Sequence, residues 1–151
     1  MEGLVKILGD EFFKKDGTKI NAATAFKGVK LVGLFFSGYW CPPCRAFSPM
    51  LQEFYEEINE DGKKFEVIFM SRDKTESDYT NYFTKMMSWI AYKYKDERIE
   101  KFIEKFGVKG IPGLLILDMQ GNKITKKGRI DIQSEFTDAF EGWEEIAEDF
   151  E

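Results

Sequence analysis

The strongest constraint on the fold is a strand-like segment that leads directly into a helix-like one. Residues 30–36 (KLVGLFF) are apolar at nearly every position, as in a central strand that is covered on both faces. In residues 43–59, apolar side chains recur at helical spacing, which predicts an amphipathic helix. We therefore expect a buried strand followed at once by a helix, with a short junction at the end of the strand.

The same two patterns continue along the chain. Residues 65–70 (FEVIFM) and 113–117 (GLLIL) are apolar runs typical of buried strands. Gly107 stands where a C-cap glycine is expected. The remaining expected elements are strands at 4–8, 19–20 and 123–125 and helices at 21–26, 79–86, 96–106 and 134–147.

The order of these elements predicts the fold class. A turn signal at residues 15–18 would join the strands at 4–8 and 19–20 into a β-hairpin. Strand–helix–strand units follow, and a second hairpin with a helix closes the chain. We expect an α/β fold with a central mixed β-sheet, helices on both faces and an N-terminal β-hairpin extension.

Length and charge limit the classes of function. A chain of 151 residues fits one compact domain, so we expect residues 1–151 to form a single unit. The net charge is −5 and no run of Lys or Arg forms a basic arm, which argues against nucleic acid as the main partner. We see no secretory signal, and the longest apolar run, residues 31–36, is too short to span a bilayer. We therefore expect no membrane partner and a reducing, cytoplasmic location that leaves room for a nuclear fraction.

The only two cysteines, Cys41 and Cys44, lie at the junction between strand and helix, in the stretch WCPPCR. Unpaired N–H groups and the positive end of the helix dipole favour a thiolate at Cys41, and a thiolate is the nucleophile of disulfide exchange. Cys44, one turn later, would lie beneath it and resolve the mixed disulfide. Pro43 suits the first helical turn, where a missing N–H costs nothing, and Pro42 stiffens the segment between the cysteines.

Three other interpretations of the cysteine pair remain open. A structural zinc site needs four Cys or His ligands, and the chain has two Cys and no His. A purely structural disulfide across two residues closes a very short loop and stabilises little. Two buried, inert cysteines are the third alternative, since free Cys is often buried. Redox chemistry fits better than these, and without histidine the thiolate has to be stabilised by the helix terminus and nearby cations.

The candidate site is completed by Trp40, Arg45 and the Ile111-Pro112 pair. We expect Trp40 to shield the cysteines from water and to offer a flat surface to a substrate, and Arg45 to support the thiolate electrostatically. Ile111-Pro112 directly precedes a predicted central strand. A cis X-Pro bond accommodates a proline there, and the alternative is an ordinary trans proline at the start of an edge strand.

With its neighbours, the motif resembles the thioredoxin superfamily, and within it the tryparedoxin and nucleoredoxin branch. The similarity covers nearly the whole chain and is carried by WCPPCR at 40–45, FEVIF at 65–69, GIP at 110–112 and Gly128-Arg129. It implies a thioredoxin fold with Cys41 as nucleophile and Cys44 as resolving thiol. It also implies that Ile111 and Pro112 form the cis-proline site, where the preceding backbone pairs with an extended substrate.

The resemblance further implies roles for two charged residues. Asp73 and Arg129 match charged positions that help tryparedoxins to recognise a glutathione-type substrate; the alternative is that both are ordinary surface charges. Phe35 stands where thioredoxin carries a buried acid, so proton transfer would go through water or another group. Gly113 replaces a threonine that usually follows the cis-proline, and residues 86–94 also depart from the pattern, which affects specificity rather than chemistry.

The leading hypothesis is an enzyme that reduces protein disulfides by dithiol exchange, with no metal and no cofactor beyond the Cys41–Cys44 disulfide. Its substrates would be disulfide-containing proteins such as a peroxiredoxin. A low-molecular-weight thiol of the glutathione or trypanothione type, or a flavin reductase, would donate the electrons. The alternative is a redox-regulated protein-binding module whose surface is formed by Trp40, Trp89 and Pro112. A third hypothesis, a structural domain with a vestigial motif, is disfavoured because both cysteines are present.

Overall fold

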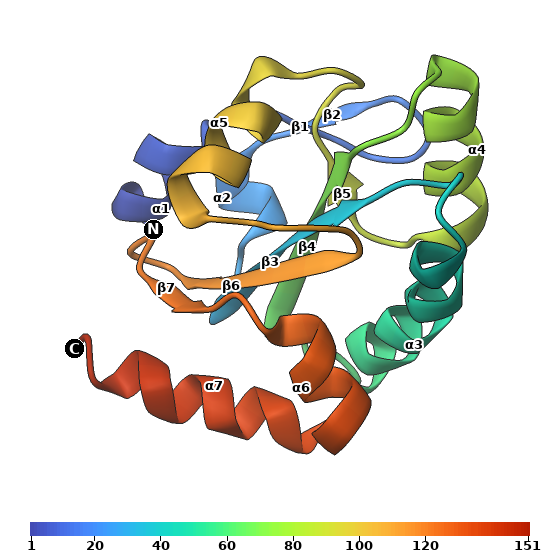
Figure 1. The fold of residues 1–151 in the computed structure, drawn as a ribbon. Coiled ribbons are helices and arrows are strands. Elements are labelled where there is room, and N and C mark those ends of the chain that lie inside the picture. Colours follow the sequence, from blue (N-terminus) through green and yellow to red (C-terminus); the bar gives the residue numbers. More distant parts are fainter.

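The computed structural model describes residues 1–151, whose strands form one seven-stranded mixed sheet (Figure 1). The strands are β1 (Phe12–Phe13), β2 (Lys19–Ile20), β3 (Leu31–Ser37), β4 (Phe65–Ser71), β5 (Ile90–Ala91), β6 (Gly113–Asp118) and β7 (Lys123–Thr125). Their order across the sheet is β2-β1-β5-β4-β3-β6-β7. Because β3 runs parallel to β4 and antiparallel to β6, it has a neighbour on each side, and every one of its residues is buried.

Seven helices cover the two faces of this sheet. They are α1 (Glu2–Leu8), α2 (Ala22–Ala25), α3 (Pro42–Ile58), α4 (Glu76–Met86), α5 (Glu97–Phe106), α6 (Gly128–Glu135) and α7 (Asp138–Glu148). Helices α1, α2 and α5 pack on one face, and α3, α4, α6 and α7 pack on the other (Figure 1). No helix combines the length and the apolar character that crossing a bilayer requires. The expected thioredoxin fold, with a mixed sheet between two layers of helices, is confirmed.

The side chains of β3 supply both hydrophobic cores. Successive residues of a strand point to opposite faces, so Leu31 and Phe35 pack under α3, α4, α6 and α7. Val32, Leu34 and Phe36 pack under α1, α2 and α5. The near-continuous apolar run at residues 30–36 therefore reflects a strand that is covered by helices on both faces of the sheet.

The predicted strand at residues 4–8 is wrong, because this segment is part of α1. Leu4 and Leu8 are both fully buried, and their separation of four residues places them on one face of a helix. A short apolar run fits a strand or a helix equally well. The N-terminal hairpin is present, but its first strand is β1, which pairs antiparallel with β2.

The single helix predicted at 134–147 is also wrong, because the segment is divided between α6 and α7. Phe136 ends α6 with a φ of 50°, a backbone conformation that interrupts a right-handed helix. Its ring packs on Phe54 of α3 at 6.1 Å between ring centroids. The break is therefore accompanied by a tertiary contact that the local pattern does not reveal.

The cis-proline segment lies beside the end of β3. Phe36 of β3 pairs with Gly113, the first residue of β6, and the Ile111–Pro112 bond that precedes β6 is cis. The end of the strand that leads to the cysteines and the first residue after the cis-proline are thus neighbours in the sheet.

Helix α6 starts unusually close to β6. Leu114 and Lys127 form an isolated parallel β-bridge. A Cβ on Gly128 would lie 2.8 Å from the Leu114 carbonyl oxygen. Real Cβ atoms do not approach backbone this closely, so glycine is needed at position 128. The next residue, Arg129, is brought to the cis-proline end of β6 by this contact.

Replacing Gly128 by Ala should destabilise the fold by about 1–3 kcal/mol, because the added methyl group overpacks the Leu114 backbone. Gly142→Ala is the matched control, since a Cβ at Gly142 in α7 would meet nothing within 4 Å. That change should stabilise by about 0.5–1 kcal/mol, the usual gain of Ala over Gly inside a helix. Urea unfolding of both variants measures the difference, and equal shifts in the same direction would contradict the packing argument.

Candidate active site

Cys41 and Cys44 form a disulfide at the N-terminus of α3. Cys41 is the N-cap residue of the helix, and the Cys44 N–H donates to its Sγ at 3.3 Å. Cys41 is 6% exposed and Cys44 is fully buried, so an incoming group reaches Cys41 first. In the reduced protein, the same N–H and the positive end of the helix dipole would stabilise a thiolate on Cys41.

Pro42 and Pro43 occupy the first two positions of α3, and both are exposed. N–H groups at these positions have no partner within a helix, so neither proline removes a hydrogen bond. Both prolines are compatible with a helix that starts immediately after Cys41.

Trp40 precedes the disulfide and is 43% exposed. Its Nε1 donates to the Arg72 carbonyl at 2.9 Å, and Lys74 Nζ lies 4.4 Å from the ring centroid. A Cβ on Gly38 would lie only 2.6 Å from Nε1, so glycine at this position lets the indole approach the chain. The indole is thus anchored while much of its surface stays available to a partner.

The backbone of Tyr39 is held at both of its polar groups. Its N–H donates to Asp73 Oδ1 at 2.6 Å, and its carbonyl accepts from Arg45 Nη1 at 2.6 Å. The Arg45 guanidinium lies 5.8 Å from the centroid of the Tyr39 ring. Arg45, which we expected to support the thiolate, therefore binds the segment that leads into the motif.

Asp73 is 7% exposed, so the alternative of an ordinary surface charge is wrong for this residue. Its Oδ2 accepts from Ser71 Oγ at 2.6 Å, in addition to the bond from Tyr39. Burial raises the pKa of the Asp73 carboxyl above its ordinary value, and the hydrogen bonds from Ser71 and Tyr39 oppose that rise. The geometry indicates that Asp73 positions the junction before Cys41.

A network of buried hydroxyl groups supports the first turn of α3. Ser37, Ser48 and Tyr82 are fully buried, and the Tyr82 hydroxyl lies within hydrogen-bonding distance of both serine hydroxyls. Ser48 Oγ donates to the Cys44 carbonyl at 2.9 Å. Burial raises the pKa of Tyr82, which keeps its hydroxyl protonated.

Which hydroxyl donates in each of these hydrogen bonds follows from the number of hydroxyl hydrogens and from the distances. Each hydroxyl has one hydrogen to donate, and Ser48 uses its hydrogen for the Cys44 carbonyl. The Cys44 carbonyl, at 3.4 Å, is a second acceptor for the Tyr82 hydrogen. Because Ser48 lies closer to the Tyr82 hydroxyl, Tyr82 donates to Ser48 and Ser37 donates to Tyr82. The chain of donors runs from β3 through α4 to the resolving cysteine's own turn, so three elements fix the position of Cys44.

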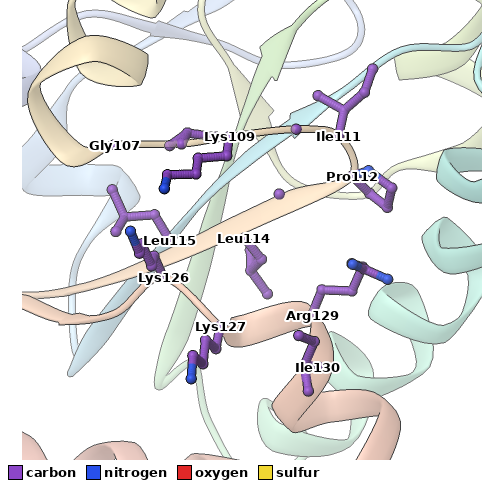
Figure 2. A pocket seen from close by; sticks show the side chains of 13 residues that line it. Gly107, Lys109, Ile111, Pro112, Leu114, Leu115, Lys126, Lys127, Arg129 and Ile130 are labelled. Carbon is purple, nitrogen blue, oxygen red and sulfur yellow. The ribbon is translucent and has the colours of Figure 1, made fainter.

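The cis-proline and Arg129 line one hollow of about 270 Å³, which we call the cis-proline hollow (Figure 2). Pro112 is buried, and Ile111 and Arg129 are half-buried. Ile111 also lines a neighbouring hollow together with Trp40. The structure thus brings together Trp40, the cis-proline segment and Arg129, which lie far apart in the sequence.

The sequence analysis missed Tyr39, Ser37, Ser48 and Tyr82. One signal was present, because Ser48 lies four residues after Cys44 on the buried face of an amphipathic helix, where a polar group needs a partner. Trp89 was placed on the binding surface, and that placement is wrong. Trp89 is 2% exposed and its ring packs against other aromatic side chains, Phe35 and Tyr55.

Comparison with known proteins agrees with this geometry. A family model described as Thioredoxin-like matches residues 28–124. This chain belongs to the thioredoxin-like family. Among curated relatives of this thioredoxin-like chain, nucleoredoxin from Danio rerio is 43% identical over 111 residues, which are 73% of this chain and 26% of that protein. The chain spans about a quarter of the length of the nucleoredoxins that it matches.

The nucleoredoxin relatives and the solved structures of tryparedoxins together support the tryparedoxin and nucleoredoxin branch. Tryparedoxin from Trypanosoma brucei is 34% identical with a TM-score of 0.81, over 93% of this chain and 97% of that chain. A tryparedoxin II complexed with glutathionylspermidine is 34% identical with a TM-score of 0.77, over 88% and 92% of the two chains.

Tyr82→Phe should lower the free energy of unfolding by about 1–3 kcal/mol, because two buried serine hydroxyls lose a partner. Tyr94→Phe is the matched control, since the Tyr94 hydroxyl is buried and has no hydrogen-bond partner. Its removal should be neutral or stabilising. Chemical unfolding of the oxidised proteins compares the two, and similar losses would show that the network carries no stability.

Asp73 should make stability depend on pH. Because the pKa of Asp73 is raised in the folded state, its contribution is favourable below the unfolded pKa of about 3.9 and is lost as pH rises through the folded pKa. The Asp73→Asn variant keeps a side chain of the same shape that cannot ionise. Its stability relative to the natural protein should therefore increase between about pH 3 and about pH 7.

Asp73→Ala distinguishes hydrogen bonding from charge. It should lose about 1–3 kcal/mol, because the Tyr39 N–H and Ser71 lose their buried acceptor. Thermal or urea unfolding of the three proteins across this pH range is the measurement. A constant difference between Asp73→Asn and the natural protein would mean that burial does not perturb this carboxyl.

Proposed function

We propose that this chain is a thiol–disulfide oxidoreductase that reduces protein disulfides through Cys41 and Cys44, and that residues 1–151 act as one thioredoxin-like domain. The observation that carries the proposal is the Cys41–Cys44 disulfide at the N-terminus of α3, reached from β3, whose end pairs with the strand that follows the cis-proline. This placement supplies an accessible nucleophile, a buried resolving thiol and a backbone segment for a substrate.

The reaction proceeds in two exchange steps. In the reduced protein, the Cys41 thiolate attacks one sulfur of the substrate disulfide, the substrate S–S bond breaks, and the other substrate sulfur leaves as a thiolate that takes up a proton. The Cys44 thiol then loses its proton and attacks Cys41 Sγ, which releases the second substrate thiolate and forms the Cys41–Cys44 disulfide. Two electrons move from the dithiol to the substrate.

The surroundings of the cysteines decide where protons go. Phe35 packs with Phe47, Phe69 and Trp89, so its position offers an aromatic ring in place of an acid. The proton of Cys44 therefore passes to water or to the departing substrate thiolate. The hydroxyl network holds the Cys44 backbone during this step.

Disulfide-containing proteins, such as a peroxiredoxin, are the proposed substrates. A low-molecular-weight thiol of the glutathione or trypanothione type, or a flavin reductase, would return the electrons. The glutathionylspermidine complex of a tryparedoxin II supports a peptide-like thiol, and Arg129 at the cis-proline is the residue we propose to meet it. A cytoplasmic location with a nuclear fraction belongs to the same proposal, since reducing compartments keep such thiols available.

A redox-regulated protein-binding module is the second candidate. The 43% exposed Trp40 beside a hollow favours it, because an exposed aromatic side chain is a typical anchor for a partner. This function would need the same surface but no turnover.

Insulin reduction driven by dithiothreitol tests the proposal. The natural protein should accelerate the reaction, whereas Cys41→Ser and Cys44→Ser should fall to the rate of dithiothreitol alone, because each lacks one exchange step. Cys44→Ser should also accumulate a mixed disulfide with the substrate, which mass spectrometry detects. Cys41→Ser is the control that should form none at position 41.

A natural protein no faster than buffer, with both thiols shown to be free and the fold intact, would argue for the binding module. In that case, partner capture should persist in Cys44→Ser and change when the disulfide is reduced.

A further inference from the structure

The loop before β6 separates two hollows whose charged lining is entirely cationic. The cis-proline hollow has Lys109, Lys126, Lys127 and Arg129 in its wall and no acidic residue (Figure 2). The second hollow, of about 500 Å³, is lined by Trp40 and by Arg72, Lys74 and Lys109, again without an acidic residue; we call it the tryptophan hollow. Both hollows share the segment from Val108 to Ile111.

This concentration of positive charge opposes the charge of the chain as a whole. The net charge is −5, with 27 acidic and 22 basic residues. A lining that holds several cations and no acidic residue therefore differs from the overall composition of the chain. Arg72 pairs with Glu100, whereas the lysines of the two hollows and Arg129 form no ion pair in the structure. Their charge is therefore available to a ligand.

The loop between the hollows also offers an unpaired backbone. The N–H groups and carbonyls of Lys109, Gly110 and Ile111 make no backbone hydrogen bond within the protein. An extended polypeptide pairs with such groups, and its alternate side chains point to opposite sides. A chain that pairs across this loop would therefore place side chains toward both hollows.

We propose that the protein substrates present their disulfide in an acidic, extended segment, with Asp or Glu side chains on either side of the reacting cysteine. This inference rests on the proposed reductase function and adds the substrate class. Lys126, Lys127 and Arg129 meet the acidic side chains on one side of the loop, and Lys74 meets them on the other. Lys109 lines both hollows and contributes to each.

A polypeptide fits these observations better than a small anionic thiol does. The cations line two hollows on opposite sides of one loop, and the free backbone groups between them suit a chain that crosses the loop. A small thiol would need only one hollow. The partner that fits is therefore a negatively charged polypeptide segment long enough to reach both hollows.

The test uses three synthetic disulfide peptides that differ only in the residues flanking the cysteines, which are Glu, Gln or Lys. The quantity measured is kcat/KM, with the uncharged reductant dithiothreitol, at low and at physiological ionic strength. The neutral Gln peptide is the reference within each variant, so that a general loss of activity or stability cancels. The natural protein should prefer the Glu peptide to the Lys peptide by about tenfold or more at low salt, and less at higher salt.

Lys126→Glu/Lys127→Glu should remove or reverse that preference. Lys14→Glu/Lys15→Glu is the matched control, because it also reverses two adjacent, exposed lysines. That pair lies at the β1–β2 turn, and β2 and β7 are opposite edges of the sheet. The control changes the net charge equally and should keep the preference for the Glu peptide.

Each failure has a distinct meaning. If the Gln peptide is reduced but the Glu and Lys peptides react equally, or if both double variants lose the preference equally, the acidic-segment proposal is wrong and the reductase function stands. If charge reversal slows the reduction of glutathione disulfide but leaves the peptide preference unchanged, the hollows bind small anionic thiols and the proposal is again wrong. If the natural protein reduces none of the peptides, the reductase function fails and this inference fails with it.

Discussion

The burial of β3 on both faces decides where the reacting sulfurs lie. Phe35 and Phe36 point into opposite cores, and both neighbouring strands hydrogen-bond the same strand. The last residue of β3 therefore cannot shift without disturbing both hydrophobic cores and the hydrogen bonds to both neighbouring strands. Since α3 starts only a few residues later, Cys41 is held at a helix N-terminus whose position is set by a fully buried strand of the sheet.

Polar groups in this apolar region are retained where they hold the junction. Asp73 fixes the N–H of Tyr39, and the hydroxyls of Ser37, Tyr82 and Ser48 connect β3 and α4 to the Cys44 carbonyl. A buried polar group without a partner costs free energy, so such groups persist when they are mutually satisfied. Here they specify one geometry for a segment that the hydrophobic core alone would leave undefined.

Much of the fold and site was predictable because it depends on local pattern. Apolar spacing predicts the strand before the motif and the helix after it. The restricted backbone of proline marks Ile111-Pro112 as a special position before β6. The failures have physical reasons. Leu4 and Leu8 fit a short strand as well as a helix, and the split near Phe136 accompanies a ring contact with Phe54, which no local pattern shows.

The sequence by itself determined the type of chemistry, because two cysteines at a strand-to-helix junction are suited to thiol–disulfide exchange once that junction is folded. Tertiary structure alone decided which side chains surround them. Asp73 became a buried anchor instead of a surface charge, Trp89 became core, and lysines from separate segments came to line hollows beside Pro112. The reason is that spacing reports which face of an element is apolar, whereas contacts between elements depend on how those faces pack together.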